Sequence, residues 1–172
     1  MSSKARIFWP LLCLLVCADC STKELVVDEL TPSVPHSIVG SMLNITLVYN
    51  PGAAFGVDVR RYFGAWTRPV LVIVMVTLLA ALLRFYRATA PTARVLAVGF
   101  ALTCGGAIGN IVDRLRFPQG VVDFIDVGIG AHRFWTFNVA DAGITVGAII
   151  LALALARDDG SSSRSLRETA AS

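Results

Sequence analysis

Four long apolar stretches make up most of this chain and limit the folds open to it. They are residues 7–27, 69–86, 95–112 and 134–156. A helix needs roughly 20 mostly apolar residues to cross the hydrocarbon of a bilayer. Only 16% of the residues are charged, whereas an average soluble protein has about 25%. The sequence therefore predicts a membrane all-α protein, a four-transmembrane-helix bundle.

The first stretch has a second interpretation. Lys4 and Arg6 precede its apolar run, as in secretory signal peptides that are removed from the mature protein. No A-x-A cleavage site follows the run. We therefore interpret it as the first membrane helix and keep cleavage as the alternative.

The region between the first two helices, residues 28–67, departs from this pattern. Within it, residues 37–50 alternate apolar and polar side chains, which is typical of a strand. The run ends at Asn50-Pro51-Gly52, a turn signal. We expect a small extracytoplasmic β element here, and we expect residues 115–133 to be a loop on the same side of the membrane.

The basic residues indicate an orientation. With four spans, both termini lie on one side, together with the loop between the second and third helices. The segments 1–6, 84–94 and 157–172 hold eight Lys or Arg residues, and basic loops favour the cytoplasm. Residues 157–172 read as a disordered cytoplasmic tail. The net charge of +3 is spread along the chain and gives no support for nucleic-acid binding.

Ionisable side chains are costly in a membrane and often mark function. At the end of the first helix, Asp19 and Lys23 lie four residues apart, the spacing and order of a helical ion pair. They are either a pair that eases the helix into the interface or residues that position a substrate or loop.

The third helix ends in a second polar group, Asn110, Asp113 and Arg114. Asn110 is either a hydrogen-bonding contact between helices or part of a site, and Asp113 with Arg114 is open to an interfacial ion pair. Gly105 and Gly109 form a small-xxx-small spacing that lets helices approach closely. The glycines are therefore interpreted as packing residues.

Two further acids, Asp123 and Asp141, lie in apolar surroundings. Asp123 lies in VVDFIDV, where apolar neighbours should raise its pKa, whereas Asp126 looks like an ordinary loop acid. Asn138 and Asp141 share a face of the fourth helix. If the loop folds back onto that helix, Asp123 and Asp141 meet. One can then hold a proton while the other acts as a base, as in aspartic proteases.

Paired aspartates also hold Mg²⁺ or Zn²⁺ in metal-dependent hydrolases. His36 and His132 are isolated in sequence, and no H-E-x-x-H motif is present. We therefore expect no metal and no cofactor.

The polar residues fall within five sequence motifs. These are ADCSTK at 18–23, YNPGAAFG at 49–56, GGAIGNIVDR at 105–114, VVDFI at 121–125 and FNVADAGITVG at 137–147. In this order the motifs resemble those of lipoprotein signal peptidase, signal peptidase II, a family of bacterial membrane aspartic endopeptidases. The resemblance covers residues 7–156, and we expect residues 1–156 to form a single membrane-embedded peptidase domain.

The resemblance implies cleavage of a diacylated prolipoprotein just before its lipid-modified cysteine, at the outer face of the bacterial inner membrane. It implies that Asp123 and Asp141 are the catalytic pair, that Asp113 braces the third helix and that Asp19 and Lys23 support the site. The residues with substrate-binding or site-ordering roles would be Asn50, Gly52, Phe55, Asn110, Arg114 and Asn138. The expected partners are the prolipoprotein and membrane lipid, and we expect a monomer.

A small transporter or channel subunit remains the alternative, with buried Asp, Asn and Arg as an ion path. Such a path needs polar groups through the whole bilayer depth. The cytoplasmic halves of the second, third and fourth helices contain almost none. A structural assembly factor would explain Gly105 and Gly109, but not two acids in separate apolar contexts.

Overall fold

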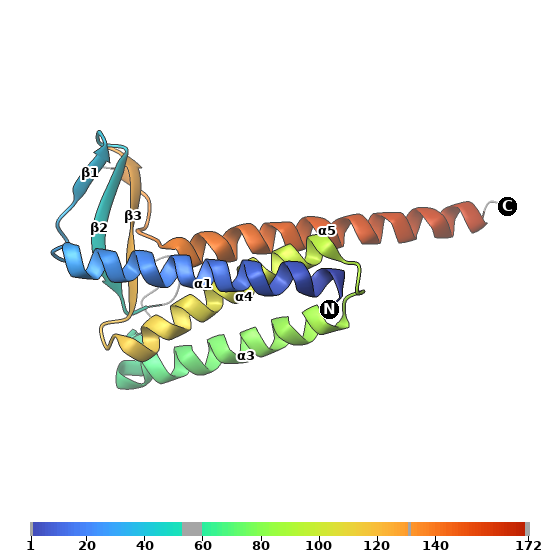
Figure 1. Cartoon of the computed structure of the whole chain (residues 1–172), viewed down its shortest axis with the longest axis horizontal. Coiled ribbons are helices and arrows are strands. Elements are labelled where there is room, and N and C mark those ends of the chain that lie inside the picture. The colour runs from blue at the N-terminus through green and yellow to red at the C-terminus, as the bar shows by residue number, and fades with distance from the viewer. Residues whose placement is uncertain (1, 53–59, 131, 171–172) are drawn as a thin grey trace.

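The computed structural model describes residues 2–52, 60–130 and 132–170. Helices run along one axis, and a small sheet stands at one end of them (Figure 1). The elements in chain order are α1 (Ser3–Glu29), β1 (His36–Val39), β2 (Leu43–Asn50), α2 (Arg60–Phe63), η2 (Gly64–Trp66), α3 (Thr67–Ala88), α4 (Arg94–Arg116), β3 (Val121–Ile129), β4 (His132–Arg133) and α5 (Val139–Ala170).

Three helical segments in the described part of the chain are long and apolar enough to cross a membrane. They are Gly64–Ala88, Arg94–Arg116 and Val139–Arg157. They correspond to the second, third and fourth expected spans. The first expected span lies in α1, which is not among these three. The structure is thus mostly helical with three candidate spans and a small antiparallel sheet.

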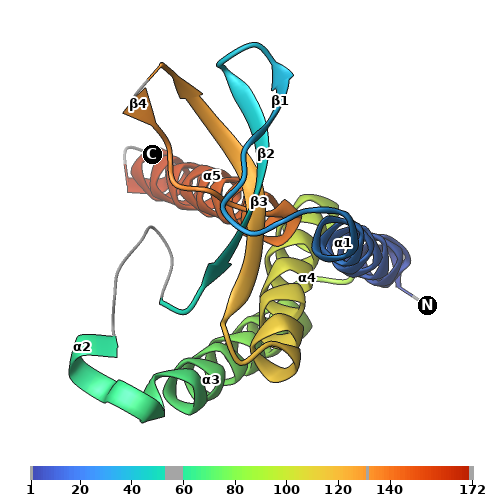
Figure 2. The same cartoon turned by 90° about the vertical axis from the view of Figure 1, so that its left-hand side faces the viewer.

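Helix α4 lies at the centre of the bundle, with α3 on one side and α1 and α5 on the other (Figure 2). Glycines let the neighbouring helices come close. A Cβ at Gly105 would contact Leu12 and Leu15 of α1, and a Cβ at Gly109 would overlap with Asp19 of α1. The interpretation of these two glycines as packing residues is confirmed.

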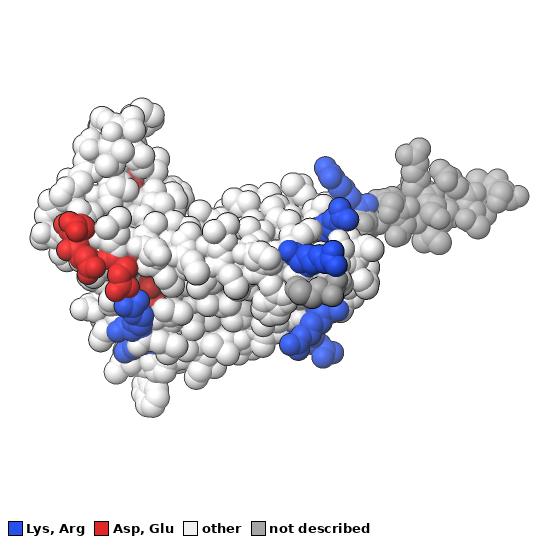
Figure 3. All heavy atoms as spheres, in the orientation of Figure 1, with Lys and Arg blue, Asp and Glu red and all other residues white. Residues whose placement is uncertain are grey.

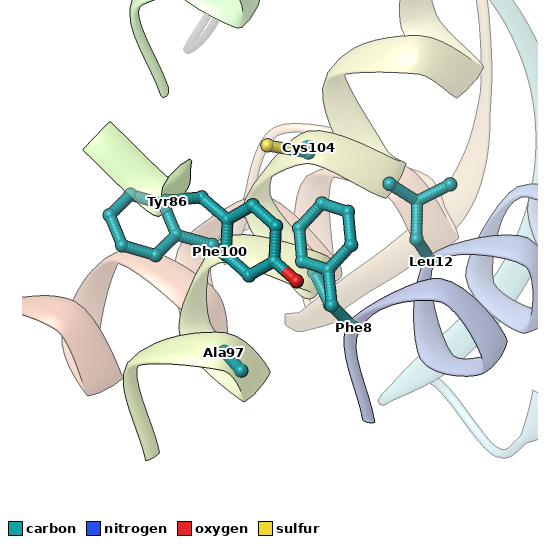
Figure 4. Packing of buried hydrophobic residues seen from close by; sticks show 7 residues of the cluster. Phe8, Leu12, Tyr86, Ala97, Phe100 and Cys104 are labelled. Atoms are coloured by element: carbon teal, nitrogen blue, oxygen red, sulfur yellow. The ribbon is translucent and has the colours of Figure 1, made fainter. Parts of the chain in front are cut away.

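An aromatic cluster closes the end of the bundle far from the sheet (Figure 4). The rings of Phe8 and Tyr86 stack with centroids 3.9 Å apart, and Phe100 meets Tyr86 edge-on at 6.1 Å. Lys4 also binds here, since its ammonium donates to the carbonyl oxygens of Tyr86 and Arg87 at the end of α3. These contacts join α1, α3 and α4.

The sheet is antiparallel with strand order β1-β2-β3-β4. Strands β1 and β2 come from the region predicted to be β, but β3 comes from residues 115–133, which were predicted to be a loop. That prediction was wrong: Val121–Ile129 form a strand, and its residues 121–124 are all buried. A strand buried on both faces reads as a continuous apolar run without alternation.

The start of the last helix also differs from the expected boundary. Residues just before α5 pair with β3 instead of continuing the helix, through a bridge between Ile125 and Phe137. The helix therefore begins at Val139 rather than 134, and it ends at Ala170 rather than 156.

Candidate active site

Asp123 lies on β3, at the end of the bundle that carries the sheet, and it is 2% exposed. Both of its carboxylate oxygens accept hydrogen bonds from amides. Asn50, at the end of β2, donates to Oδ2 at 3.0 Å, and Asn138 donates to Oδ1 at 2.7 Å. The carboxylate is thus held between the sheet and the start of α5.

Asn138 is placed there by the pairing of its own segment with β3. The amide of Ile125 donates to the carbonyl of Phe137 at 2.8 Å, and the amide of Phe137 donates back at 3.1 Å. Asn138 also caps α5, because its Oδ1 accepts from the backbone amide of Asp141 at 2.9 Å. One side chain therefore both starts the helix and binds Asp123.

Asp141 lies in the first turn of α5 and is partly exposed. Its Oδ1 accepts from Asn110 at 2.8 Å, and its Oδ2 accepts from the backbone amide of Asn138 at 3.3 Å. The two acids therefore share Asn138 as a hydrogen-bond partner. Burial, and then the nearby charge of Asp141, raise the pKa of Asp123 to about 7.

A buried cation lies behind the two acids. Lys23 is 2% exposed, and its ammonium lies 2.7 Å from Asp19 Oδ2 and 2.8 Å from Asp113 Oδ2. It also donates to Asn110 Oδ1 at 3.1 Å. The predicted pair of Asp19 and Lys23 is present, and its contacts with α4 make it part of this polar cluster.

The two acids bound to Lys23 each hold a backbone amide next to Asp123 or Asp141. Asp113 accepts from the amide of Val122 at 3.0 Å, and Asp19 accepts from the amide of Ala140 at 2.8 Å. Each of these amides belongs to the residue just before one of the two candidate acids. The cluster of Lys23, Asp19 and Asp113 therefore positions the backbone on both sides of the site.

Arg114 connects α4 to the turn after β2. It donates to the carbonyl of Gly52 at 2.8 Å, and the amide of Gly52 donates to Asn50 Oδ1 at 3.1 Å. The sequence left open an ion pair of Arg114 with Asp113, but Asp113 pairs with Lys23 instead. Phe55, which the resemblance implies to be a site residue, lies outside the described residues.

Known proteins match this chain along most of its length. Residues 11–157 fit the family model for signal peptidase (SPase) II. The chain belongs to the signal peptidase II family. It is therefore an aspartic-type peptidase, and the resemblance drawn from the five motifs is confirmed.

Individual relatives give the same result. A lipoprotein signal peptidase of Moorella thermoacetica is 40% identical over 146 residues, covering 82% of this chain and 87% of its own length. One from Desulforapulum autotrophicum is 36% identical over 143 residues, covering 80% and 83%. A solved structure of a bacterial membrane enzyme has a TM-score of 0.73 at 30% identity, and the match covers 87% of each chain.

Two polar residues of this signal peptidase II family member have contacts that the sequence did not reveal. Asp126 is not an ordinary loop acid, since it accepts from Arg133 at 2.8 Å and from Thr46 at 3.3 Å. It thereby joins β2, β3 and β4. Arg68, at the start of α3, donates to two carbonyl groups at the end of α4.

Proposed function

We propose that the chain removes the signal peptide from diacylated prolipoproteins by cutting just before the lipid-modified cysteine. Water activated between Asp123 and Asp141 would be the nucleophile. The observation that carries this proposal is the position of Asn138, which binds the side chains or backbone of both acids. The relatives named lipoprotein signal peptidase supply the substrate class.

The chemistry needs one proton shared by the two carboxyl groups. The raised pKa of Asp123, about 7, lets it keep a proton at neutral pH, while the more exposed Asp141 is the base. Asp141 takes a proton from water, and the hydroxide forms a bond to the scissile carbonyl carbon. Asp123 gives its proton to the carbonyl oxygen. The C–N bond then breaks as Asp141 gives its proton to the leaving amine, and a hydroxyl group of the intermediate returns a proton to Asp123 as the carbonyl re-forms.

The hydrogen bonds of Asn110 and Asn50 favour defined orientations of the two acids. Asn110 donates to Asp141, and Asn50 donates to Asp123. Arg114, whose guanidinium is buried beside the Gly52 turn, would hold that turn while substrate backbone enters. Donors fixed before the substrate arrives reduce the reorganisation needed in the transition state.

We further propose that α1 also crosses the membrane, which makes a four-helix bundle with the three candidate spans. Both termini would then be cytoplasmic. Figure 3 shows most of the visible Lys and Arg side chains at the end of the bundle opposite the sheet, whereas the acids on this face gather at the sheet end beside a smaller basic group. Basic residues favour the cytoplasmic side. The site then lies at the outer surface, where a lipid-anchored substrate and water can both reach it. Residues 1–156 would act as one monomeric domain.

The transporter alternative has less support. Among the described residues, most buried charged side chains lie in the cluster at the sheet end, namely Asp19, Lys23, Asp113, Arg114 and Asp123. The exception is Lys4, whose ammonium is bound by carbonyl groups at the end of α3. This distribution suits a site at one surface better than a path through the bilayer.

The test is cleavage of a diacylated prolipoprotein by the purified chain in detergent, with and without EDTA. The variants are Asp123→Asn and Asp141→Asn, with the exposed Asp28→Asn as control. We expect wild type and Asp28→Asn to cleave in both conditions, and the other two to stay folded without cleaving. Normal cleavage by either site variant, or loss of cleavage with EDTA, would contradict the proposed chemistry.

A further inference from the structure

Arg68 contacts the last turn of α4 from the first turn of α3. Its Nε donates to the carbonyl of Arg114, and its terminal nitrogen donates to the carbonyl of Leu115 at 2.8 Å. Carbonyl groups in the last turn of a helix have no partner within the helix. The amide of Phe117 takes the carbonyl of Asp113 at 2.7 Å. Arg68 therefore completes the cap of α4 from a neighbouring helix.

Helix α3 buries few of its residues, and the hydrogen bonds of Arg68 are among the contacts that hold its start against α4. Only 6% of the membrane-length window in Gly64–Ala88 is buried, and the buried residues of α3 are Thr67 and Tyr86 at its two ends. A cavity of about 170 Å³ separates the start of α3 from the turn after β2. Its walls are formed by Pro51, Gly64, Ala65, Thr67, Arg68, Arg114, Pro118 and Gly120.

From the end of α4, a series of hydrogen bonds leads to Asp123. Arg114 donates to the carbonyl of Gly52, and the amide of Gly52 donates to Asn50 Oδ1. With its oxygen occupied, Asn50 presents its NH₂ group to Asp123 Oδ2 at 3.0 Å. A shift of the last turn of α4 would move Arg114 and loosen this last bond.

We propose that Arg68 is a positioning residue for Asp123, acting through Arg114, Gly52 and Asn50. This inference rests on the proposed function of Asp123. The planar guanidinium holds two carbonyl groups in a fixed geometry, which the point charge of a lysine does not reproduce. Arg68→Lys should therefore recover only part of the effect of Arg68.

The experiment compares Arg68→Gln and Arg68→Lys with wild type, and uses the exposed Arg84→Gln on the same helix as control. We expect Arg68→Gln to lower kcat about tenfold, with KM changed less than about twofold. The Asn50 hydrogen bond holds the pKa of Asp123 down. Its loss should therefore move the limb of the pH–rate profile due to Asp123 to higher pH. A purely structural role would lower the unfolding temperature without this shift.

A double-mutant cycle tests the route through Asn50. In an Asn50→Ala background, Arg68→Gln should cost little further activity, because the last bond is already absent. Equal losses in both backgrounds, or a pH profile unchanged by Arg68→Gln, would overturn the inference. Carbon-13 NMR of the aspartate carboxyl groups, assigned with Asp123→Asn, reads the same pKa shift without cleavage. Failure of wild type to cleave therefore counts against the proposed function. An Asp123 resonance that titrates at the same pH in Arg68→Gln as in wild type counts against the positioning role of Arg68.

Discussion

Lys23 determines which way the amide of Asn110 faces. Its ammonium donates to Asn110 Oδ1 at 3.1 Å, and Asn138 donates to the same oxygen at 3.2 Å. The NH₂ group of Asn110 is therefore turned toward Asp141, to which it donates at 2.8 Å. A buried cation that does not touch Asp141 thus fixes one of its hydrogen bonds.

Replacing Lys23 by Met should destabilise the fold strongly. The change leaves the carboxylates of Asp19 and Asp113 buried without their cation, and loss of one partner of a buried pair costs about 3–5 kcal/mol. Thermal unfolding in detergent measures the effect. Arg116→Gln is the matched control, because it breaks the exposed ion pair with Glu24 and should produce no measurable change.

The role of Lys23 in orienting Asn110 predicts a second effect. Adding Asp19→Asn to Lys23→Met removes one unpaired charge and should restore part of the stability, but not the activity. Recovery of normal cleavage in this double variant would show that the orientation of Asn110 does not depend on Lys23.

Asn138→Ser should separate helix capping from contact with Asp123. Serine is as good an N-cap as asparagine, so α5 should still begin at the same place. The short hydroxyl cannot replace the amide donor that lies 2.7 Å from Asp123 Oδ1. A buried acceptor left without its donor costs about 1–3 kcal/mol, or roughly a 5- to 150-fold loss of kcat/KM.

Measurement of helix content and cleavage on one sample tests this separation. Asn138→Ala is the comparison, because it removes the cap as well and should also lower the unfolding temperature. Wild-type activity in the serine variant would mean that the amide of Asn138 does not order Asp123.

The sequence predicts the part of the site that lies on helices and in motifs. Apolar length locates α3 and α4 to within a few residues, and the spacing of Asp19 and Lys23 predicts their ion pair. Strand β3 was missed because burial on both faces removes its alternation. The contacts of Arg68 could not be predicted, since its partners are carbonyl groups that every residue has. Only the packing of α3 on α4 brings them within reach.

The pKa of Asp123 predicts how stability changes with pH. The value rises from 3.8 to about 7 because the carboxyl group is buried near Asp141. Between these pH values the folded protein keeps a proton that the unfolded chain releases. The folded state therefore binds more protons, and its stability falls as pH rises from about 4 to 7. Asp123→Asn cannot titrate, so this part of the slope should be absent from that variant.

Unfolding midpoints at pH 4.5 and pH 7.5 give the comparison. Wild type should lose more stability than Asp123→Asn between the two values, and its cleavage rate should fall above about pH 7 as the proton is lost. Parallel changes in the two proteins would show that Asp123 is already ionised near pH 4.5.

Gly109→Ala should disturb the site from within the helix packing. An added Cβ would overlap with Asp19 Oδ2 and lie 3.4 Å from the Cβ of Ala140. Asp19 would have to move away from the amide of Ala140, which it binds at 2.8 Å, and the start of α5 with Asp141 would move too. Gly105→Ala is the matched control on the same helix, since its Cβ would meet the side chain of Leu15 at 3.1 Å and the backbone carbonyl of Leu12 at 3.2 Å rather than Asp19. Overpacking costs about 1–3 kcal/mol, so both variants should unfold at lower temperature.

Only Gly109→Ala should lose most of its cleavage activity at a temperature where both remain folded. Equal activity in the two folded variants would show that Asp19 does not position α5 for catalysis.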